Sequence, residues 1–466
     1  MPLILPGNVA SATASTTYSV ANSCRFNSAD TAYMTKTLGT PTDADKYTFS
    51  FWVKRCKLGS QQSIFRSTNG NDDSHVTFRS DDTLEFQEYG GLSSIGEIQT
   101  TQVFRDVSAW YHIVLVWDSG NGTAGNRMRM YVNGTEVTSF GTDTNPSQDA
   151  DSFFNKASAP LHFGRTDYSG GGDYFDGYVA EVVMCDGQAY AASDFGEFDE
   201  DSPTIWKPKD VSGLTFGTNG FYLDFEASDN LGNDANGGTD LTETNLAATD
   251  QATDTPTNNF CTLNPLVRSA NFTFSEGNCK FESGSSDAYG AGIGTFGLTA
   301  GKWYWEVKIG ESGEDWRNHT HGVISELTQE LYSYATGLQN DTGVTQYANN
   351  DGGAVSRDGT VAYNNYGELD IDDILGIAFN ADDNQITFLD NGSALVSDYA
   401  TSTTRGVIFP FIRCGGSTIA EVNFGGCSSF TISSAANDEN GYGNFEIAPP
   451  SGYLALCSKN LGSDGG

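Results

Sequence analysis

The chain has 466 residues and a formal net charge of −36, with 24 Lys and Arg against 60 Asp and Glu. Nucleic acid and anionic membranes bind clusters of basic side chains, and this sequence has no such cluster, so neither is expected as a partner. The length suggests two to four domains. With 54 glycines and only 18% charged residues, the composition is typical of short strands joined by turns.

The first 20 residues have the character of an extended arm. Leu3, Ile4 and Leu5 are its only apolar run, and Pro2 and Pro6 bracket it. The run is too short to insert into a membrane, and no basic region precedes it as in a signal peptide. We expect residues 1–20 to attach the chain to another protein or to a sister subunit; an unanchored tail is the alternative.

Strand patterns begin with residues 47–54, which alternate between two faces. A buried run follows at 113–117, and after a polar loop a second alternating strand covers 128–132. Asn133-Gly134 ends that strand, and this pair favours the two positive φ angles of a tight hairpin. The pattern predicts an antiparallel hairpin with one face in a core.

Five segments of this region occur in the order of a known fold: FSFWVKR, WYHIVLVWD, RMYVNGTEV, LHFGR and FDGYVAEVVMCDGQA. Together they resemble laminin-G-like and concanavalin-A-like jelly rolls. The resemblance implies a first β-sandwich over residues 21–200.

A connecting segment is expected over residues 201–262. Its part from 226 to 259 has seven acidic residues, no Lys or Arg, and much Gly, Asn and Thr. That composition predicts an acidic linker between two domains, although such a segment can still be ordered against a neighbour.

The second half has a similar hairpin. A buried run at 374–379 precedes a polar turn, an alternating strand at 385–388 and then Asn391-Gly392. Together with KWYWEVKI, GVIFPFIR and AEVNFG, these segments resemble a SPRY domain. The resemblance implies a second β-sandwich over 263–460 that binds partners through its loops and has no catalytic machinery; residues 461–466 would be a tail.

The predicted fold class is therefore all-β, with two antiparallel, jelly-roll-like β-sandwich domains joined by an acidic linker. The eight cysteines are scattered without CxxC spacing, which argues against a zinc site. Their even number allows disulfides, but buried free thiols are an equal alternative in a chain with large cores.

No catalytic residues are expected. Glucanases of the concanavalin-like fold use E-x-D-x-x-E on one strand, and the nearest match here starts at Glu197 and Asp199 but ends at Ser202. No GxSxG elbow accompanies the five histidines. The chain is thus predicted not to be an enzyme.

No cofactor is required by this prediction, but calcium is compatible with one loop. Asp167, Asp173 and Asp176 flank a run of three glycines. Asp118, in the loop after the buried run that ends at Trp117, could contribute a further ligand. Calcium binds six to eight oxygens of this kind. A solvated acidic loop is the alternative interpretation.

Ligand binding is expected in the long segment between residues 309 and 359. Candidate aromatic platforms for a sugar are Trp316, Tyr332, Tyr334 and Tyr347. His319 and His321 would point the same way in an extended chain, where two ligands could hold a metal, although a wet turn is the simpler interpretation. Some of the aromatic residues would instead pack in the core.

The phrases LPGNVASATA, GTNGFYLDFEASDNLGND and TDTPTNNFCTLNPL resemble structural proteins of tailed, especially marine, bacteriophages. That resemblance implies a virion protein that is made in the host cytoplasm, contacts other virion proteins and forms a homo-oligomer. The favoured function is a tail-fibre or receptor-binding component that engages host-surface glycan or protein. A capsid decoration or head fibre is the first alternative, and a surface-polysaccharide depolymerase the second.

Overall fold

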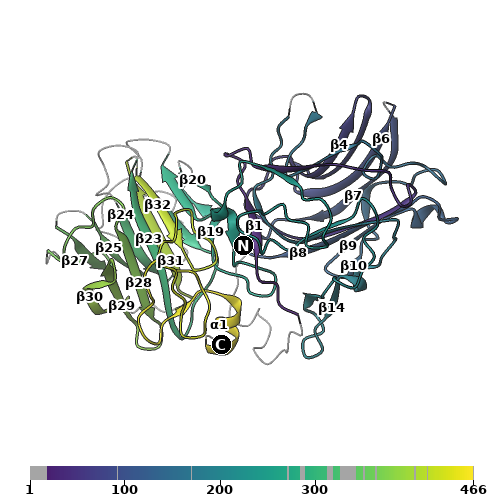
Figure 1. The fold of residues 1–466 in the computed structure, drawn as a ribbon. Helices are drawn as coiled ribbons and strands as arrows, with labels where there is room; N and C mark the ends of the chain where they lie inside the picture. Colours follow the sequence, from purple (N-terminus) through teal and green to yellow (C-terminus); the bar gives the residue numbers. More distant parts are fainter. Residues whose placement is uncertain are drawn as a thin grey trace. The chain divides into compact units, whose positions relative to one another are not determined.

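The computed structural model describes residues 18–464, apart from 92, 169–170, 270–271, 284–288, 312–318, 326–342, 350–351, 363–364, 403–405 and 417. The attachment arm with Leu3, Ile4 and Leu5 therefore lies outside the described residues. The chain divides into two compact units, one ending at Thr257 and the other starting at Asn258 (Figure 1). Within the described residues, no helix has the length and apolar character needed to cross a membrane.

The first domain is a sandwich of two antiparallel sheets. The first sheet has the order β10 (Thr135–Glu136), β9 (Met128–Val132), β8 (Tyr111–Asp118), β3 (Lys46–Arg55), β13 (Gly177–Asp186), β1 (Ser23–Phe26) and β18 (Gln251–Ala252), and β16 (Phe221–Leu223) also pairs with β13. The second has the order β11 (Phe140–Thr144), β7 (Ser93–Val103), β6 (Thr83–Gly90), β5 (Asp72–Phe78), β4 (Gln62–Asn69), β12 (Pro160–Phe163), β2 (Tyr33–Thr37) and β17 (Thr242–Thr244). Short 3₁₀ turns lie at Ala124–Asn126, Ala192–Asp194 and Ala248–Asp250.

The alternation in β3 determines which side chains enter the core. Phe49, Phe51 and Val53 are fully buried between the two sheets, and the ring of Phe49 stacks on Phe65 of β4 with ring centroids 4.7 Å apart. The opposite face of this sheet is also buried, because residues that follow β13 fold back over it. Among them is a hairpin of β14 (Gly196–Phe198) and β15 (Trp206–Pro208).

The expected linker is part of the first domain, which corrects the prediction from composition. Residues 226–257 supply β17 and β18, which extend the two sheets. Two acidic residues of the segment form buried ion pairs: Asp250 with Arg25 at 2.9 Å, and Asp254 with Lys54 at 2.7 Å. Composition predicted a linker because it cannot reveal that strands far away in the sequence supply the matching cations.

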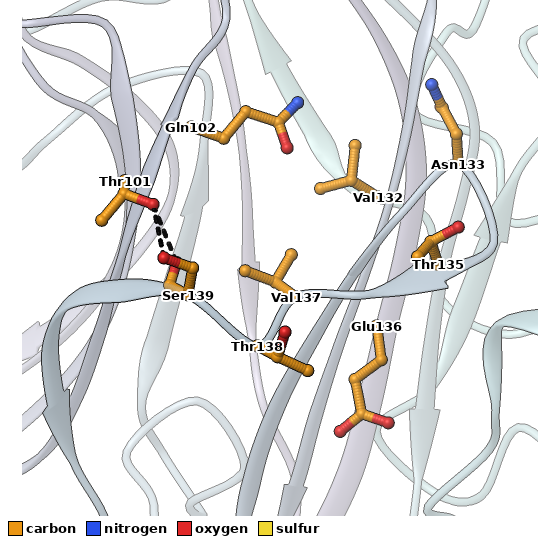
Figure 2. Close-up of a pocket in the computed structure, with 9 residues that line it drawn as sticks. All are labelled: Thr101, Gln102, Val132, Asn133, Thr135, Glu136, Val137, Thr138 and Ser139. Carbon is orange, nitrogen blue, oxygen red and sulfur yellow. Dashed lines mark hydrogen bonds between the residues drawn. The ribbon is translucent and has the colours of Figure 1, made fainter.

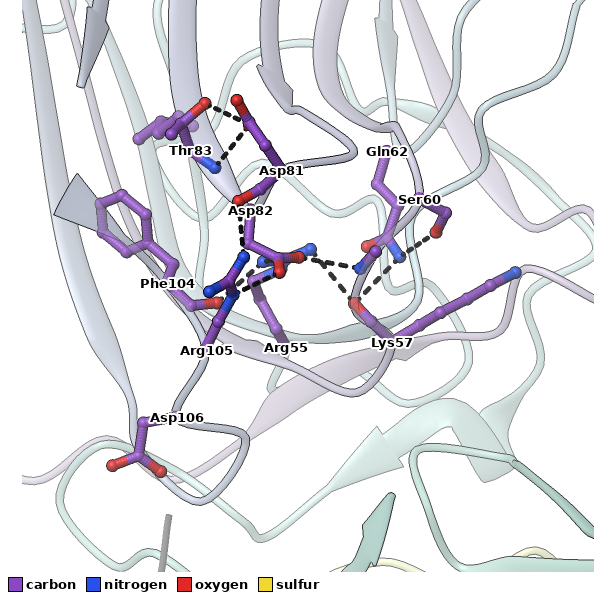
Figure 3. A network of polar contacts seen from close by, with 12 residues as sticks. Arg55, Lys57, Ser60, Gln62, Asp81, Asp82, Thr83, Phe104, Arg105 and Asp106 are labelled. Carbon is purple, nitrogen blue, oxygen red and sulfur yellow. Dashed lines mark hydrogen bonds and ion pairs between the residues drawn. The ribbon is translucent and has the colours of Figure 1, made fainter. Parts of the chain in front are cut away.

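A polar network in the first domain is centred on Asp82 (Figure 3). The guanidinium of Arg55 donates to the Asp82 carboxylate at 3.2 Å and to the Phe104 carbonyl at 2.8 Å. Arg105 Nε donates to the other Asp82 oxygen at 2.8 Å, and the Gly59 N–H donates to the first at 2.9 Å. Three loops are thereby held together by one carboxylate.

The second domain is also a sandwich of two sheets. One has the order β19 (Leu263–Arg268), β22 (Tyr289–Gly294), β31 (Phe409–Gly415), β24 (His319–Ile324), β25 (Val344–Ala348), β26 (Ala354–Arg357) and β27 (Thr360–Ala362). The other has the order β20 (Phe272–Ser275), β21 (Lys280–Ser283), β32 (Thr418–Asn423), β23 (Lys302–Glu311), β28 (Ile374–Asn380), β29 (Gln385–Asp390) and β30 (Ser393–Ala400), with β33 (Leu454–Ala455) parallel to β23. The predicted all-β fold class is confirmed.

The hairpin predicted in the second half is present. β28 pairs with β29 in antiparallel register, and Asn391 and Gly392 adopt φ angles of 45° and 85° between β29 and β30. The C-terminal residues differ from the predicted tail, since α1 (Ser458–Asp464) buries Leu461 in the core of this domain.

The eight cysteines all lie in the described part of the chain. Each thiol is buried and none is paired in a disulfide. Of the two alternatives that the sequence left open, the structure has buried free thiols.

Candidate functional site

An open depression of about 350 Å³ lies at the edge of the first domain, where β7 ends beside the β9–β10 hairpin. Figure 2 shows Val132 and Val137 at its centre, surrounded by polar side chains. Its lining consists of Thr101, Gln102, Val132, Asn133, Thr135, Glu136, Val137, Thr138 and Ser139. Small-ligand sites combine apolar surface with a few polar groups that fix orientation, and this lining offers two valines together with amide, hydroxyl and carboxylate groups.

Local hydrogen bonds hold this lining in place. Thr101 Oγ1 lies 2.9 Å from Ser139 Oγ, and the Thr101 N–H donates to the Ser139 carbonyl at 3.3 Å. Asn133 Oδ1 accepts from the His112 N–H at 2.8 Å, which orients the Asn133 side chain. The predicted tight turn is confirmed, with φ of 47° at Asn133 and 76° at Gly134.

An aromatic stack supports the same turn. A Cβ atom added to Gly134 would lie 2.3 Å from the Trp206 ring, so only glycine allows this close approach. Trp206 Nε1 donates to His112 Nδ1 at 3.0 Å, and the His112 ring stacks on Trp52 with centroids 4.7 Å apart. Burial lowers the pKa of His112 to about 3, so the ring stays neutral. Its Nδ1 can therefore accept the hydrogen bond that Trp206 Nε1 donates.

Phe198 adds an exposed ring beside this stack. It is 45% exposed and meets Trp206 edge-on, with centroids 4.9 Å apart. The hairpin of β14 and β15 therefore carries an exposed apolar ring in the neighbourhood of the Asn133–Gly134 turn. Together these residues offer a sugar both hydrogen-bonding groups and an apolar surface.

The candidate ligand residues of the second domain are not at its surface where the structure describes them. His319 and His321 are each 1% exposed on β24, and Tyr347 is 1% exposed on β25. The Tyr347 hydroxyl donates to the Gly367 carbonyl. The prediction that these three side chains bind a ligand at the surface is therefore wrong, because strand alternation turns them inward.

The other three candidates of that segment, Trp316, Tyr332 and Tyr334, lie outside the described residues.

The four aspartates considered for calcium have separate partners. His162 Nε2 lies 3.0 Å from Asp167 Oδ2, and Gln61 donates to Asp173 at 3.0 Å. The Ser28 hydroxyl donates to Asp176 at 2.7 Å, and Asn121 donates to Asp118 at 3.1 Å. Among the described residues, no three of these carboxylates come together as one ligand set.

The incomplete glucanase motif lies on the β14–β15 hairpin and its turn, not on a strand of either sheet. Lys207 Nζ is 3.5 Å from Glu197 Oε1 and 3.4 Å from Asp199 Oδ2, so both carboxylates share one cation. Partial burial acts to raise the pKa of Asp199, but the N–H groups of Ser202 and Asp201 and the charge of Lys207 lower it overall. A general acid needs the opposite shift.

Two family models match the chain. Residues 27–191 match the Concanavalin A-like lectin/glucanases superfamily, and residues 302–427 match the SPRY domain. These matches support both resemblances found in the sequence. They define a class of protein that joins a lectin-like domain to a SPRY domain, two folds generally used for binding. No curated protein matches the chain.

Some solved structures are similar to part of the chain. The SPRY domain of human HERC1 is 14% identical over 36% of this chain and 99% of that chain, with a TM-score of 0.30. A native heptameric SAP-like pentraxin from Limulus polyphemus is 19% identical over 37% of this chain and 80% of that chain, with a TM-score of 0.28.

The depression was not found from the sequence. The Asn133-Gly134 pair signalled the turn, but Trp206 is 72 positions beyond Gly134, and no local pattern links the two. Thr101 and Ser139 likewise meet only because β7 pairs with β11.

Proposed function

We propose that this chain is a non-enzymatic adhesion protein whose first domain binds a surface glycan in the depression between β7 and the β9–β10 hairpin. The observation that supports this function most directly is the valine floor ringed by Gln102, Asn133, Thr135 and Glu136. Sugars offer C–H faces to apolar surface and hydroxyls to amides and carboxylates. The match to a lectin superfamily supports the same class of ligand.

The pocket is tested by removing single polar groups. Gln102→Ala and Glu136→Ala should each weaken glycan binding roughly tenfold, since one hydrogen bond contributes about 0.5–1.5 kcal/mol and somewhat more to a charged group. Binding is measured on an array of defined bacterial polysaccharides and oligosaccharides, followed by titration of the best binder. Both residues are exposed, so folding should be unaffected.

Gln148→Ala and Asp143→Ala are the matched controls, because both residues are exposed and neither lines the depression. They should bind as the wild type does. Equal binding by all four variants would place the glycan elsewhere, and release of sugar from the polysaccharide would contradict the non-enzymatic function.

The more specific role we propose is a tail-fibre or receptor-binding component of a phage particle, with other virion proteins as partners. It rests on the resemblance of three sequence phrases to tailed-phage structural proteins. In this proposal Leu3, Ile4 and Leu5 attach the chain to the particle. Tyr18, the first described residue, is held to the domain by a 2.9 Å hydrogen bond to Glu181.

Deleting residues 1–15 tests the attachment. The truncated chain should fold normally but be lost from purified particles, because three buried apolar side chains contribute roughly 1.5–3 kcal/mol each to docking. Copy number per particle is measured by quantitative mass spectrometry. A wild-type copy number would mean that a sandwich face makes the attachment.

A further inference from the structure

Three buried side chains of the second domain converge on one point. His319 on β24 lies directly opposite Cys414 on the neighbouring strand β31, and His321 lies two residues further along the same face. His319 Nδ1 is 2.9 Å from His321 Nε2 and 3.8 Å from Cys414 Sγ. All three ligating atoms lie within 4.8 Å of one another, and no side chain is more than 1% exposed.

A contact with the facing sheet determines which nitrogen of His319 is free. His319 Nε2 is 3.0 Å from the Gly310 carbonyl of β23, so Nε2 carries the proton and donates it. The lone pair of His319 is then on Nδ1, which faces the other two residues. A ligating histidine usually has such an outer hydrogen bond to a carbonyl or carboxylate.

Without a cation, His319 Nδ1 can accept a hydrogen bond from His321 Nε2, and Cys414 has a further side-chain hydrogen bond with Thr418. The single lone pair on His319 Nδ1 faces two groups that can donate a proton, His321 Nε2 and the Cys414 thiol. If His321 instead carries its proton on Nδ1, two lone pairs face each other at 2.9 Å. His321 Nδ1 has no partner among the described residues in either tautomer, so this atom does not distinguish the two cases.

The distances suit metal coordination. With metal–nitrogen bonds of about 2.0–2.1 Å and a metal–sulfur bond of about 2.3 Å, tetrahedral geometry places two nitrogens about 3.3 Å apart and nitrogen and sulfur about 3.6 Å apart. The observed separations of 2.9 and 3.8 Å differ from these by a few tenths of an ångström. The third separation, between His321 and Cys414, is within 4.8 Å, so the side chains must move closer together for all three to hold one ion.

We propose that His319 Nδ1, His321 Nε2 and Cys414 Sγ form a binding site for a thiophilic metal ion, with copper(I) favoured over zinc(II). Thiolate and imidazole ligands select these two ions. Copper(I) with one thiolate is neutral, whereas zinc(II) would leave a net positive charge in a fully buried place, which is costly. Binding releases the thiol proton of Cys414 to solvent, so affinity rises with pH.

The site is independent of the glycan depression, which lies in the other domain. A bound ion would join β24 to β31 and, through the Gly310 hydrogen bond, hold both against β23. Its expected effect is to stabilise the second domain.

The test uses the full chain expressed in metal-depleted medium. Copper(I) under reducing conditions, zinc(II) and calcium(II) are added separately, and metal per chain is measured by mass spectrometry after dialysis. We expect one copper per chain, a thiolate-to-metal absorption band and a raised unfolding temperature. Cys414→Ser and His321→Gln should weaken binding by at least the roughly 10–100-fold that loss of an outer-shell partner costs.

Cys279→Ser is the matched control, since Cys279 is also buried in the second domain but lies outside the cluster. It should bind copper as the wild type does. X-ray absorption of the copper-loaded wild type should show both sulfur and imidazole ligands, which keeps the test valid if a variant fails to fold. Absence of bound copper or zinc, unchanged binding by Cys414→Ser, or a metal spectrum without sulfur would overturn the proposal.

Discussion

Glu306→Ala is expected to destabilise the second domain by about 3–6 kcal/mol. The buried carboxylate of Glu306 accepts hydrogen bonds from the N–H groups of Ile447 at 2.7 Å and Glu446 at 3.1 Å, and from Asn423 Nδ2 at 3.0 Å. Alanine leaves these donors unsatisfied, at roughly 1–3 kcal/mol each. Because Glu306 ties the C-terminal segment to β23, its loss should also release residues 446 and 447. Urea unfolding followed by circular dichroism measures the effect.

Glu282→Ala is the control for this substitution. Glu282 lies on β21 of the same sheet, its side chain is 39% exposed, and its ion pair with Lys280 spans 3.6 Å. The expected change is below about 0.5 kcal/mol. An equally small effect of Glu306→Ala would show that the buried carboxylate does not hold the C-terminal segment.

The same carboxyl group predicts a pH dependence. Burial raises the pKa of Glu306 from 4.5 to about 7, so the folded state favours the protonated form. The part of its contribution to stability that depends on protonation is therefore full below pH about 4.5 and is lost as the pH rises through 7. Glu306→Gln lacks this group, so the stability advantage of the wild type over this variant should shrink between pH 4.5 and 8, by roughly 1.4 kcal/mol per pKa unit.

Asp254→Ala should destabilise the first domain by about 3–5 kcal/mol. Lys54 and Asp254 are almost completely buried and lie 2.7 Å apart, and Trp110 Nε1 donates to the same carboxylate at 3.0 Å. Removing one partner of a buried pair leaves an uncompensated charge, which costs more than the pair itself contributes. Thermal unfolding should show the loss in the first domain, while the transition of the second domain stays in place.

Asp229→Ala is the matched control, because Asp229 lies in the same acidic segment but is exposed. Its expected effect is within about 0.5 kcal/mol.

A chain ending at residue 257 should fold cooperatively, whereas one ending at 220 should not, since it lacks β16, β17 and β18. Cooperative folding of the shorter chain, or equal effects of Asp254→Ala and Asp229→Ala, would show that residues 226–257 are a linker and not part of the first domain.

Much of the fold could be predicted from local patterns. The alternation of Phe49, Phe51 and Val53 is a property of one strand, and so is the buried run at 374–379. The pairs Asn133-Gly134 and Asn391-Gly392 specify tight turns through their own φ preferences. The order of such segments along the chain was enough to indicate both domains and the all-β class.

The site was less predictable, because its residues are assembled by non-local pairing. Alternation correctly places His319 and His321 on one face of a strand, but only the pairing of β24 with β31 brings Cys414 to them, 95 residues away from His319. Packing against the facing sheet, where His319 Nε2 lies 3.0 Å from the Gly310 carbonyl, buries both rings, and no local sequence pattern reveals that packing.

The sequence by itself determined the strands, their faces, the tight turns and the class of the two domains, since these depend on residues within a few positions of one another. Only the tertiary structure decided that residues 226–257 belong to the first domain, that Trp206 supports the Asn133–Gly134 turn and that the ligand candidates of β24 and β25 are buried. The physical reason is that burial and charge pairing depend on which distant strands become neighbours, and that information is not present in any single segment.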